Sequence, residues 1–146
     1  GTGQSDYLPL TDGQDLQLEA GPQGGHHIWM AVRMKNLRQS GSTTTITSTP
    51  VDGPMVLAPL AVVFTYDVDE GGYCKVVGLR YQVDVSGLAP DGSSIPAPRV
   101  RDFLGRTLIV TAEVVDSTGA KASASKRVHL KDKILCADGT ENCNTP

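Results

Sequence analysis

The sequence predicts an all-β domain: two packed antiparallel sheets with about seven strands in total. Val, with 15 copies, is the commonest large apolar residue, and Thr and Ser add 23 residues, so strand-forming side chains dominate. The 16 Gly and 9 Pro separate the apolar runs, which is typical of short strands joined by turns. No segment of useful length has helical periodicity. A β-sandwich best fits this pattern, and an eight-stranded barrel is the alternative.

The N-terminal third contains a leader and two expected strands. Residues 1–13 lack periodicity and read as a leader that ends in a turn. A short strand is expected over 14–20, and a longer one over 26–37 after the loop GPQGG. Because side chains alternate between the two faces of a strand, the even-numbered residues of the longer strand are assigned to the core.

The next two segments contrast in polarity. Residues 42–49 (STTTITST) are β-branched and almost wholly polar, which favours an edge strand with two wet faces. Residues 57–66 (LAPLAVVFTY) are apolar at nearly every position, which favours a strand covered on both faces, with Pro59 at its start or at a bulge.

Three further strands complete the expected sandwich. Residues 76–86 alternate, and this pattern points Val77 inward together with Leu79 and Tyr81. Residues 107–115 and 121–130 flank the turn-forming tetrapeptide Asp-Ser-Thr-Gly, which predicts a hairpin. The predicted core comprises Ile28, Val32, Leu60, Val62, Phe64, Leu79, Tyr81, Val83, Leu108, Val110 and Val114.

The domain organisation follows from these elements. We expect a leader over 1–13, one β-sandwich domain over 14–131, and a Cys-containing tail over 132–146. A chain of 146 residues suffices for one domain with its own core.

Charge and hydropathy exclude two classes of partner. Sixteen acidic residues outnumber 13 scattered basic ones, so the chain lacks the clustered basic surface that nucleic-acid binding requires. No apolar run approaches the roughly 20 residues of a membrane-spanning helix. A protein or a glycan is therefore the expected kind of partner.

Two segments are familiar. LIVTAEVVDSTGAKASASKRVHL resembles the closing hairpin of bacterial immunoglobulin-like domains. GPQGGHHIWMAVRMKNL is similar to a segment near the start of small secreted or lipid-anchored proteins of Gram-negative bacteria. The resemblance implies an immunoglobulin-like sandwich in an exported protein that is periplasmic, outer-membrane-anchored or extracellular. It carries over no catalytic or binding residue.

The three cysteines are compatible with export. Six residues separate Cys136 from Cys143, and an oxidising compartment would close such a loop with a disulfide. Cys74 could instead pair with either tail cysteine and pin the tail onto the sandwich. The remaining alternative is a set of free thiols in a cytosolic protein.

No catalytic or cofactor motif is present. A serine hydrolase of the α/β type would carry GxSxG between a strand and a helix, and the chain has neither. A nucleophilic cysteine would need a nearby histidine, which Cys74 has only by tertiary accident. The sequence therefore predicts a non-enzymatic protein without a cofactor.

Metal binding is the alternative function. Copper would suit the imidazoles and thioethers of His26, His27, Met30, Met34 and His129. Positions i and i+4 on a strand lie about 13 Å apart, however, so His26 and Met30 cannot share one ion. Calcium would suit the acidic residues of DVDEGG and of the tail, although the helix-loop-helix pattern of calcium sites is absent. No metal ligands are assigned.

One surface stands out as a candidate binding site. Its residues combine an adaptable backbone loop with an imidazole, an aromatic ring and a cation. In the alternative interpretation the glycines only serve a tight turn and the ring is buried under the leader. The predicted binding residues are Gly24, Gly25, His27, Trp29 and Arg33.

Overall fold

The computed structural model describes residues 1–141 and confirms the all-β class. No α-helix occurs in this range, and only two single turns of 3-10 helix interrupt the strands. None of its helices has the length and hydropathy needed to span a bilayer. The strands are β1 (Gln14–Ala20), β2 (His26–Lys35), β3 (Ser42–Pro50), β4 (Leu60–Phe64), β5 (Asp67–Val68), β6 (Tyr73–Gln82), β7 (Gly87–Leu88), β8 (Ser94–Ile95), β9 (Thr107–Val115) and β10 (Lys121–Leu135), and the 3-10 turns are η1 (Glu70–Gly72) and η2 (Val100–Asp102).

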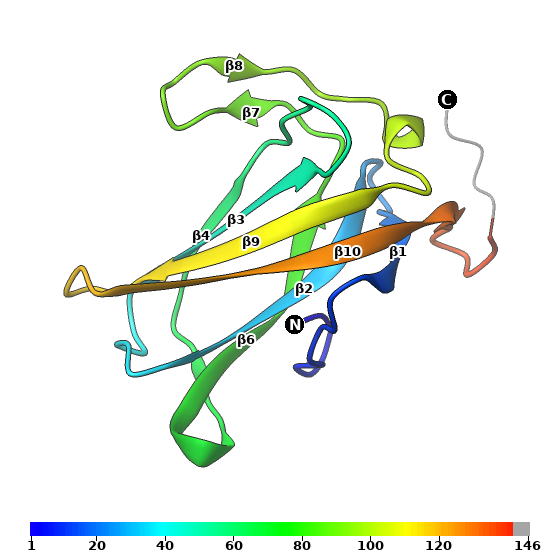
Figure 1. The fold of residues 1–146 in the computed structure, drawn as a ribbon. Coiled ribbons are helices and arrows are strands. Elements are labelled where there is room, and N and C mark those ends of the chain that lie inside the picture. Colours follow the sequence, from blue (N-terminus) through cyan, green and yellow to red (C-terminus); the bar gives the residue numbers. More distant parts are fainter. Residues whose placement is uncertain (142–146) are drawn as a thin grey trace.

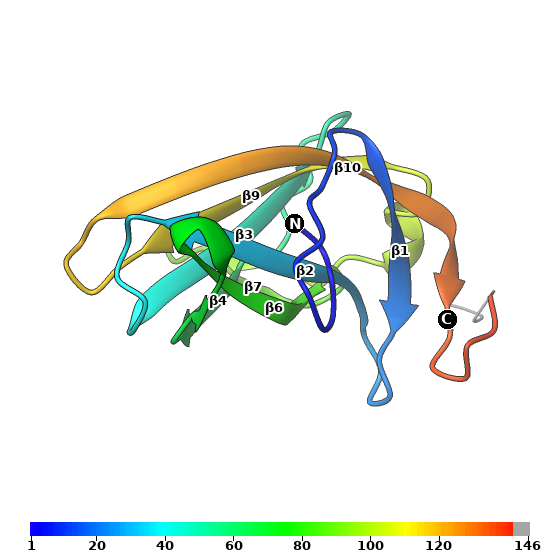
Figure 2. The same cartoon turned by 90° about the horizontal axis from the view of Figure 1, so that it is seen from below.

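Eight of the strands form one curled sheet in the order β4-β3-β9-β10-β1-β2-β6-β5 (Figure 1). Figure 2 shows β9 and β10 on one side and β2 and β6 on the other, with β1 where the sheet turns. About seven antiparallel strands in two separate sheets were expected. The structure differs because β1 pairs with both β10 and β2, and its pairing with β10 is parallel.

The strand β1 pairs with only part of each neighbour. Its first residue, Gln14, aligns with Val128 of β10, and its last two residues align with His26 and His27 of β2. Leu18 points from β1 into the core and is fully buried. On the side that precedes Gln14, where β1 begins, no strand lies between the first half of β10 and the second half of β2.

The prediction of an exposed edge strand over 42–49 is wrong. β3 lies inside the sheet between β4 and β9, and three of its hydroxyl-bearing residues are buried. Two of them are bonded to tyrosines: Thr44 to the Tyr66 hydroxyl, and Ser48 to the Tyr81 hydroxyl at 2.9 Å. A polar strand is tolerated in the interior because the hydroxyls have these partners.

The apolar segment 57–66 is not covered on both faces. Its strand, β4, pairs only with β3 and forms one edge of the sheet. Val63 is 67% exposed and Phe64, predicted for the core, is 43% exposed. Leu60 and Val62 are half-buried against the core. The remaining apolar side chains of β4 are left in contact with solvent, so a continuous apolar run does not secure burial here.

A β-bulge in β6 reverses the expected orientation of its first half. Met30 aligns with Leu79 and Val32 with Val76, so two residues of β6 lie opposite one residue of β2. Val76 is therefore buried in place of Val77. The bulge contains Gly78, whose φ is +71°, and its N–H donates to the Gly3 carbonyl of the leader at 3.0 Å.

The predicted hairpin between residues 107–115 and 121–130 is confirmed. β9 and β10 pair in register around a turn at Asp116, which accepts bonds from Thr118, Ala120 and the backbone N–H of Arg38. Hydrogen bonds from the Thr118 hydroxyl and the Arg38 N–H lower the pKa of Asp116 to about 2. β10 continues to Leu135, past the expected domain limit at residue 131.

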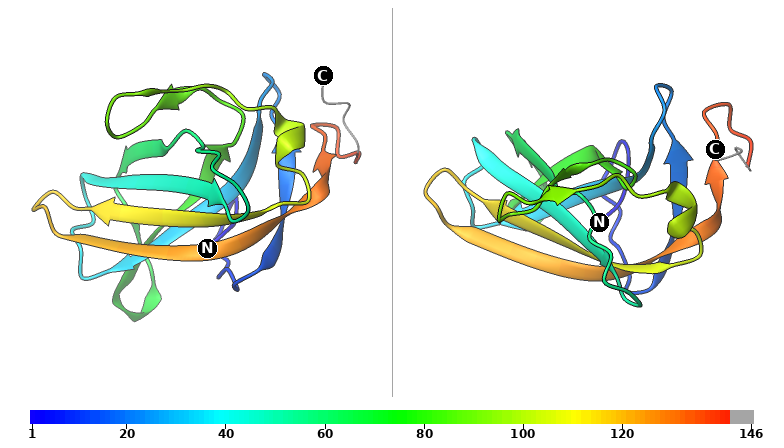
Figure 3. Two further views of the ribbon diagram at one scale, coloured as in Figure 1. Left: turned by 45° about the horizontal axis from the view of Figure 1, so that its top comes forward. Right: turned by 90° about the horizontal axis from the view of Figure 1, so that it is seen from above.

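One end of the core is covered by loops. The β7–β8 ribbon and η2 lie on the side away from the β5–β6 turn (Figure 3). Val100 of η2 and the following Phe103 are buried in the core, as is Leu57 of the connection between β3 and β4. Phe103 is fully buried although sequence periodicity did not mark it.

We expect Tyr81→Phe to lower the free energy of unfolding by about 1–2 kcal/mol, because it leaves the buried Ser48 hydroxyl without its partner. Urea unfolding measures the change. The matched control is Tyr73→Phe, since the Tyr73 hydroxyl has no hydrogen-bond partner among residues 1–141, and it should stay within about 0.5 kcal/mol of the parent. Equal effects of the two substitutions would contradict the prediction.

Candidate functional site

The predicted binding glycines form the turn between β1 and β2. Gly24 and Gly25 have φ values of +85° and +77°, which L side chains rarely adopt. The Gly21 N–H donates to the Gly25 carbonyl at 2.9 Å, and the Gly24 N–H donates to the Gly21 carbonyl at 3.2 Å. These hydrogen bonds close a tight turn, and the turn by itself explains why glycine occupies both positions.

His27 and Trp29 lie together on the outer face of β2. Their rings meet edge to face with centroids 4.8 Å apart. His27 is only 5% exposed, and its Nε2 has no hydrogen-bond partner among the described residues. Trp29 is half-buried: its Nε1 donates to Glu19 at 2.8 Å, and the Arg80 guanidinium lies 5.0 Å from the ring centroid. The polar edge of the indole is thus already engaged.

Arg33 has a different set of partners. It forms an ion pair with Asp69 at 2.9 Å and stacks on Tyr73, with 4.2 Å between the guanidinium and the ring centroid. The leader residue Tyr7 lies on the same guanidinium at 5.8 Å. His27 and Trp29 therefore lie in one cluster of side chains, and Arg33 lies in another.

Burial also determines the charge state of His27. Desolvation is the main cause that lowers its pKa, and the Arg80 charge adds to it, while Glu19 acts in the opposite direction. The ring is therefore neutral under conditions in which an exposed histidine is partly charged.

A groove that the sequence analysis did not predict opens beside the start of β1, on the side that precedes Gln14. It lies between the first half of β10 and the second half of β2 and has a volume of about 510 Å³, within the range of small-molecule sites. The N-terminal residues enter the same opening beside β2, where the Gly1 carbonyl accepts from Ala31 at 3.0 Å (Figure 2).

The groove is apolar inside and basic at its rim. Ala122 and Ala124 of β10 align with Val114 and Ala112 of β9, so they lie on the face of the sheet that elsewhere forms the core. Both alanines are nevertheless exposed, because no side chain covers them from β2. The lining includes no acidic residue, whereas it includes Arg33, Lys35 and Lys126.

One local signal pointed to this groove. In the strand 121–130, the inward positions run Ala122, Ala124, Lys126 and Val128, so a lysine interrupts the core-facing face. Periodicity alone could not show that the strands on either side diverge at this point.

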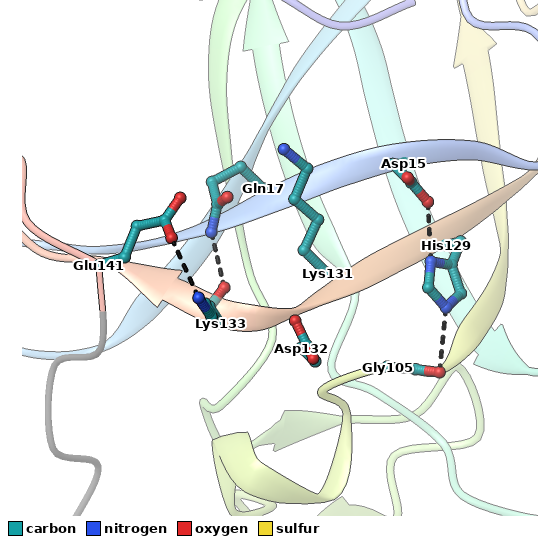
Figure 4. Close-up of a pocket in the computed structure, with 8 residues that line it drawn as sticks. All are labelled: Asp15, Gln17, Gly105, His129, Lys131, Asp132, Lys133 and Glu141. Atoms are coloured by element: carbon teal, nitrogen blue, oxygen red, sulfur yellow. Dashed lines mark hydrogen bonds and ion pairs between the residues drawn. The ribbon is translucent and has the colours of Figure 1, made fainter.

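A second, polar pocket lies over β1 and β10 (Figure 4). Within it His129 Nδ1 bonds to Asp15 at 2.8 Å, and Nε2 faces the Gly105 carbonyl at 3.1 Å. The nitrogen that a catalytic histidine would present to a substrate is thus occupied. Among the other charged side chains of the lining, Lys133 is paired with Glu141 at 3.5 Å. The lining contains no hydroxyl or thiol nucleophile.

The metal and cysteine expectations have these outcomes. Within residues 1–141 no three His, Cys, Asp or Glu side chains gather as metal ligands would, and His26 is bonded to Asp84 at 2.7 Å.

Cys74 is a free thiol, so the alternative that pairs it with a tail cysteine differs from the structure. Cys143 lies outside the described residues, and its pairing with Cys136 stays a prediction.

Comparisons with known protein families, with curated proteins and with solved structures found no match to this chain.

We expect the free energy of unfolding to decrease as the pH falls below about 6.5, before the carboxylates titrate near pH 4. The unfolded chain then binds a proton at His27, whereas burial lowers the pKa of that ring in the folded state. Denaturant unfolding at several pH values measures the slope. His27→Phe should flatten it and His129→Gln should retain it; an unchanged slope in the His27 variant would refute this assignment.

Proposed function

We propose that this chain is a non-enzymatic binding module that holds an apolar ligand in the groove between β2 and β10. The observation that carries the proposal is the interruption of the sheet beyond β1, which exposes core-facing side chains to solvent. Natural sheets normally cover such a face, and an uncovered apolar concavity is the usual form of a ligand site.

The groove supports binding better than the surface around Trp29. A protein or glycan partner remains compatible with the loop at Gly24 and Gly25, but His27 is covered and Trp29 already uses its N–H. The groove, in contrast, has apolar surface without an internal partner. Metal binding has no comparable support, since no ligand cluster is found in the described part of the chain.

We also propose that the curled sheet is an immunoglobulin-like arrangement of the variable type. In that arrangement strands A, B, E and D form one sheet, and strand C′ joins C, F and G in the other. Along this chain β1, β2, β6 and β5 take the places of A, B, E and D, and β4, β3, β9 and β10 take those of C′, C, F and G. The strand order supports this proposal, as does the hairpin β9–β10.

We place the module outside the cytoplasm, in the cell envelope or beyond it. The proposal is supported by the composition rich in Thr, Ser and Gly and by the two cysteines near the C-terminal end of the sequence. Such a pair is stable as a disulfide in the periplasm or outside the cell.

The groove should bind a neutral apolar fluorophore such as N-phenyl-1-naphthylamine at one saturable site, seen as enhanced emission. Ala124→Trp places a large side chain in the groove and should lower the affinity by at least about tenfold. Ser125→Trp is the matched control. Ser125 lies on the opposite face of β10 from Ala124, where its hydroxyl bonds to Thr111 of β9. Equal loss in both variants, or no saturable binding by the parent, would overturn the proposed function.

The tail cysteines should be paired in protein folded in air, so alkylation under denaturing conditions should add one group before reduction and three after it. The single reactive thiol is Cys74, which is free in the structure. Cys74→Ser should therefore accept no group before reduction. Intact-mass spectrometry reads the result, and three alkylated cysteines without reduction would remove the chemical support for export.

A further inference from the structure

We propose that the ligand of the groove is a single-chain amphiphile with an anionic head group, such as a carboxylate. The inference rests on the proposed function and adds the chemical class of the ligand. In this arrangement the alkyl chain lies against the apolar interior of the groove, and the head group lies at Lys126 and Lys35 on its rim.

Lys126 lies on the inward face of β10. It aligns with Val110 of β9, and the next inward residue, Val128, is fully buried. Lys126 thus projects from the core-facing side of β10 at the place where the groove begins. An ammonium group directed toward an apolar surface is suited to an anion that lies at the end of an apolar chain.

The lining of the groove supplies no acidic partner for its lysines. Lys126 and Lys35 form no ion pair with any residue in the described range, although eight other pairs occur there. Lys35 rests on the Tyr73 ring at 4.9 Å, which holds it at the rim. Arg33 is neutralised by Asp69, so the two lysines carry the uncompensated positive charge.

The interior of the groove is lined by small and by flexible side chains. Small side chains at Ala112 and Ala124 leave space between the strands, and Met30 and Met34 line the opposite side. Methionine adapts to chains of different length because it is flexible and polarisable. A cavity of about 510 Å³ without carboxylates admits an alkyl chain and does not favour a polar or cationic ligand.

Two other interpretations of Lys126 make different predictions. An inward-directed lysine can simply protect the open edge of β10 from pairing with other chains. An extended peptide could alternatively add a strand along this edge. Neither interpretation requires a preference for an anionic head group or an increase of affinity with alkyl length.

The experiment measures displacement of N-phenyl-1-naphthylamine from the full chain by dodecanoate, dodecanol and dodecyltrimethylammonium, each below its micellar concentration. Dodecanoate should bind at least about tenfold tighter than dodecanol, because a hydrogen bond to a charged partner contributes about 1.5–3 kcal/mol. Dodecanoate should also bind about tenfold tighter than decanoate, since each buried methylene adds about 0.8 kcal/mol.

Substitutions locate the head group. Lys126→Glu should abolish the preference for dodecanoate over dodecanol through a loss of dodecanoate affinity. Lys121→Glu is the matched control, because Lys121 lies on the same strand but does not line the groove, and it should retain the preference. The preference should also decrease at high salt, as expected for an exposed charge pair.

The outcomes separate this inference from the proposed function. Equal affinities for dodecanoate and dodecanol would leave the groove as a binding site but overturn the anionic class. A failure of the fluorophore and of all three amphiphiles to bind would overturn both. If Lys126→Glu forms oligomers in size-exclusion chromatography while its preference for dodecanoate persists, Lys126 only protects the strand edge and the inference is wrong.

Discussion

The arrangement of the whole molecule depends on the double pairing of β1. This seven-residue strand pairs with β10 on one edge and with β2 on the other, and so joins two groups of strands into one curled sheet. Its partners are longer, with 15 residues in β10 and 10 in β2. The same short strand therefore closes the sheet at one end and leaves the groove at the other.

Buried hydroxyl groups connect the two sides of the curl. Ser48 of β3 bonds to Tyr81 of β6, and Thr44 of β3 bonds to Tyr66, just after β4. Burying these hydroxyl groups costs little free energy only while each keeps its hydrogen-bond partner. Because apolar packing is non-directional and these bonds are not, they select one relative position of the strands.

The groove and the leader have a common structural origin. Because of the bulge at Gly78, and because β1 starts only at Gln14, backbone groups of β6 and β2 stay free on one side, and the Gly3 and Gly1 carbonyls of the leader accept hydrogen bonds from them. The leader covers part of the opening, whereas the exposed alanines and Lys126 remain uncovered. An unpaired strand edge is a liability, so its retention beside unpaired lysines is consistent with a ligand that occupies it.

Local patterns determined the all-β class, the hairpin around Asp116 and the adjacency of His27 and Trp29, because alternation and turn chemistry depend only on neighbouring residues. The positions of β3 and β4, the bulge at Gly78 and the separation of Arg33 from Trp29 depended on which strands came to lie beside them. No local pattern predicted the groove, except that strand alternation places Lys126 on the inward face of its strand. The existence of the groove is set by the unequal lengths of β1, β2 and β10, and only the folded sheet brings β10 beside the two N-terminal strands.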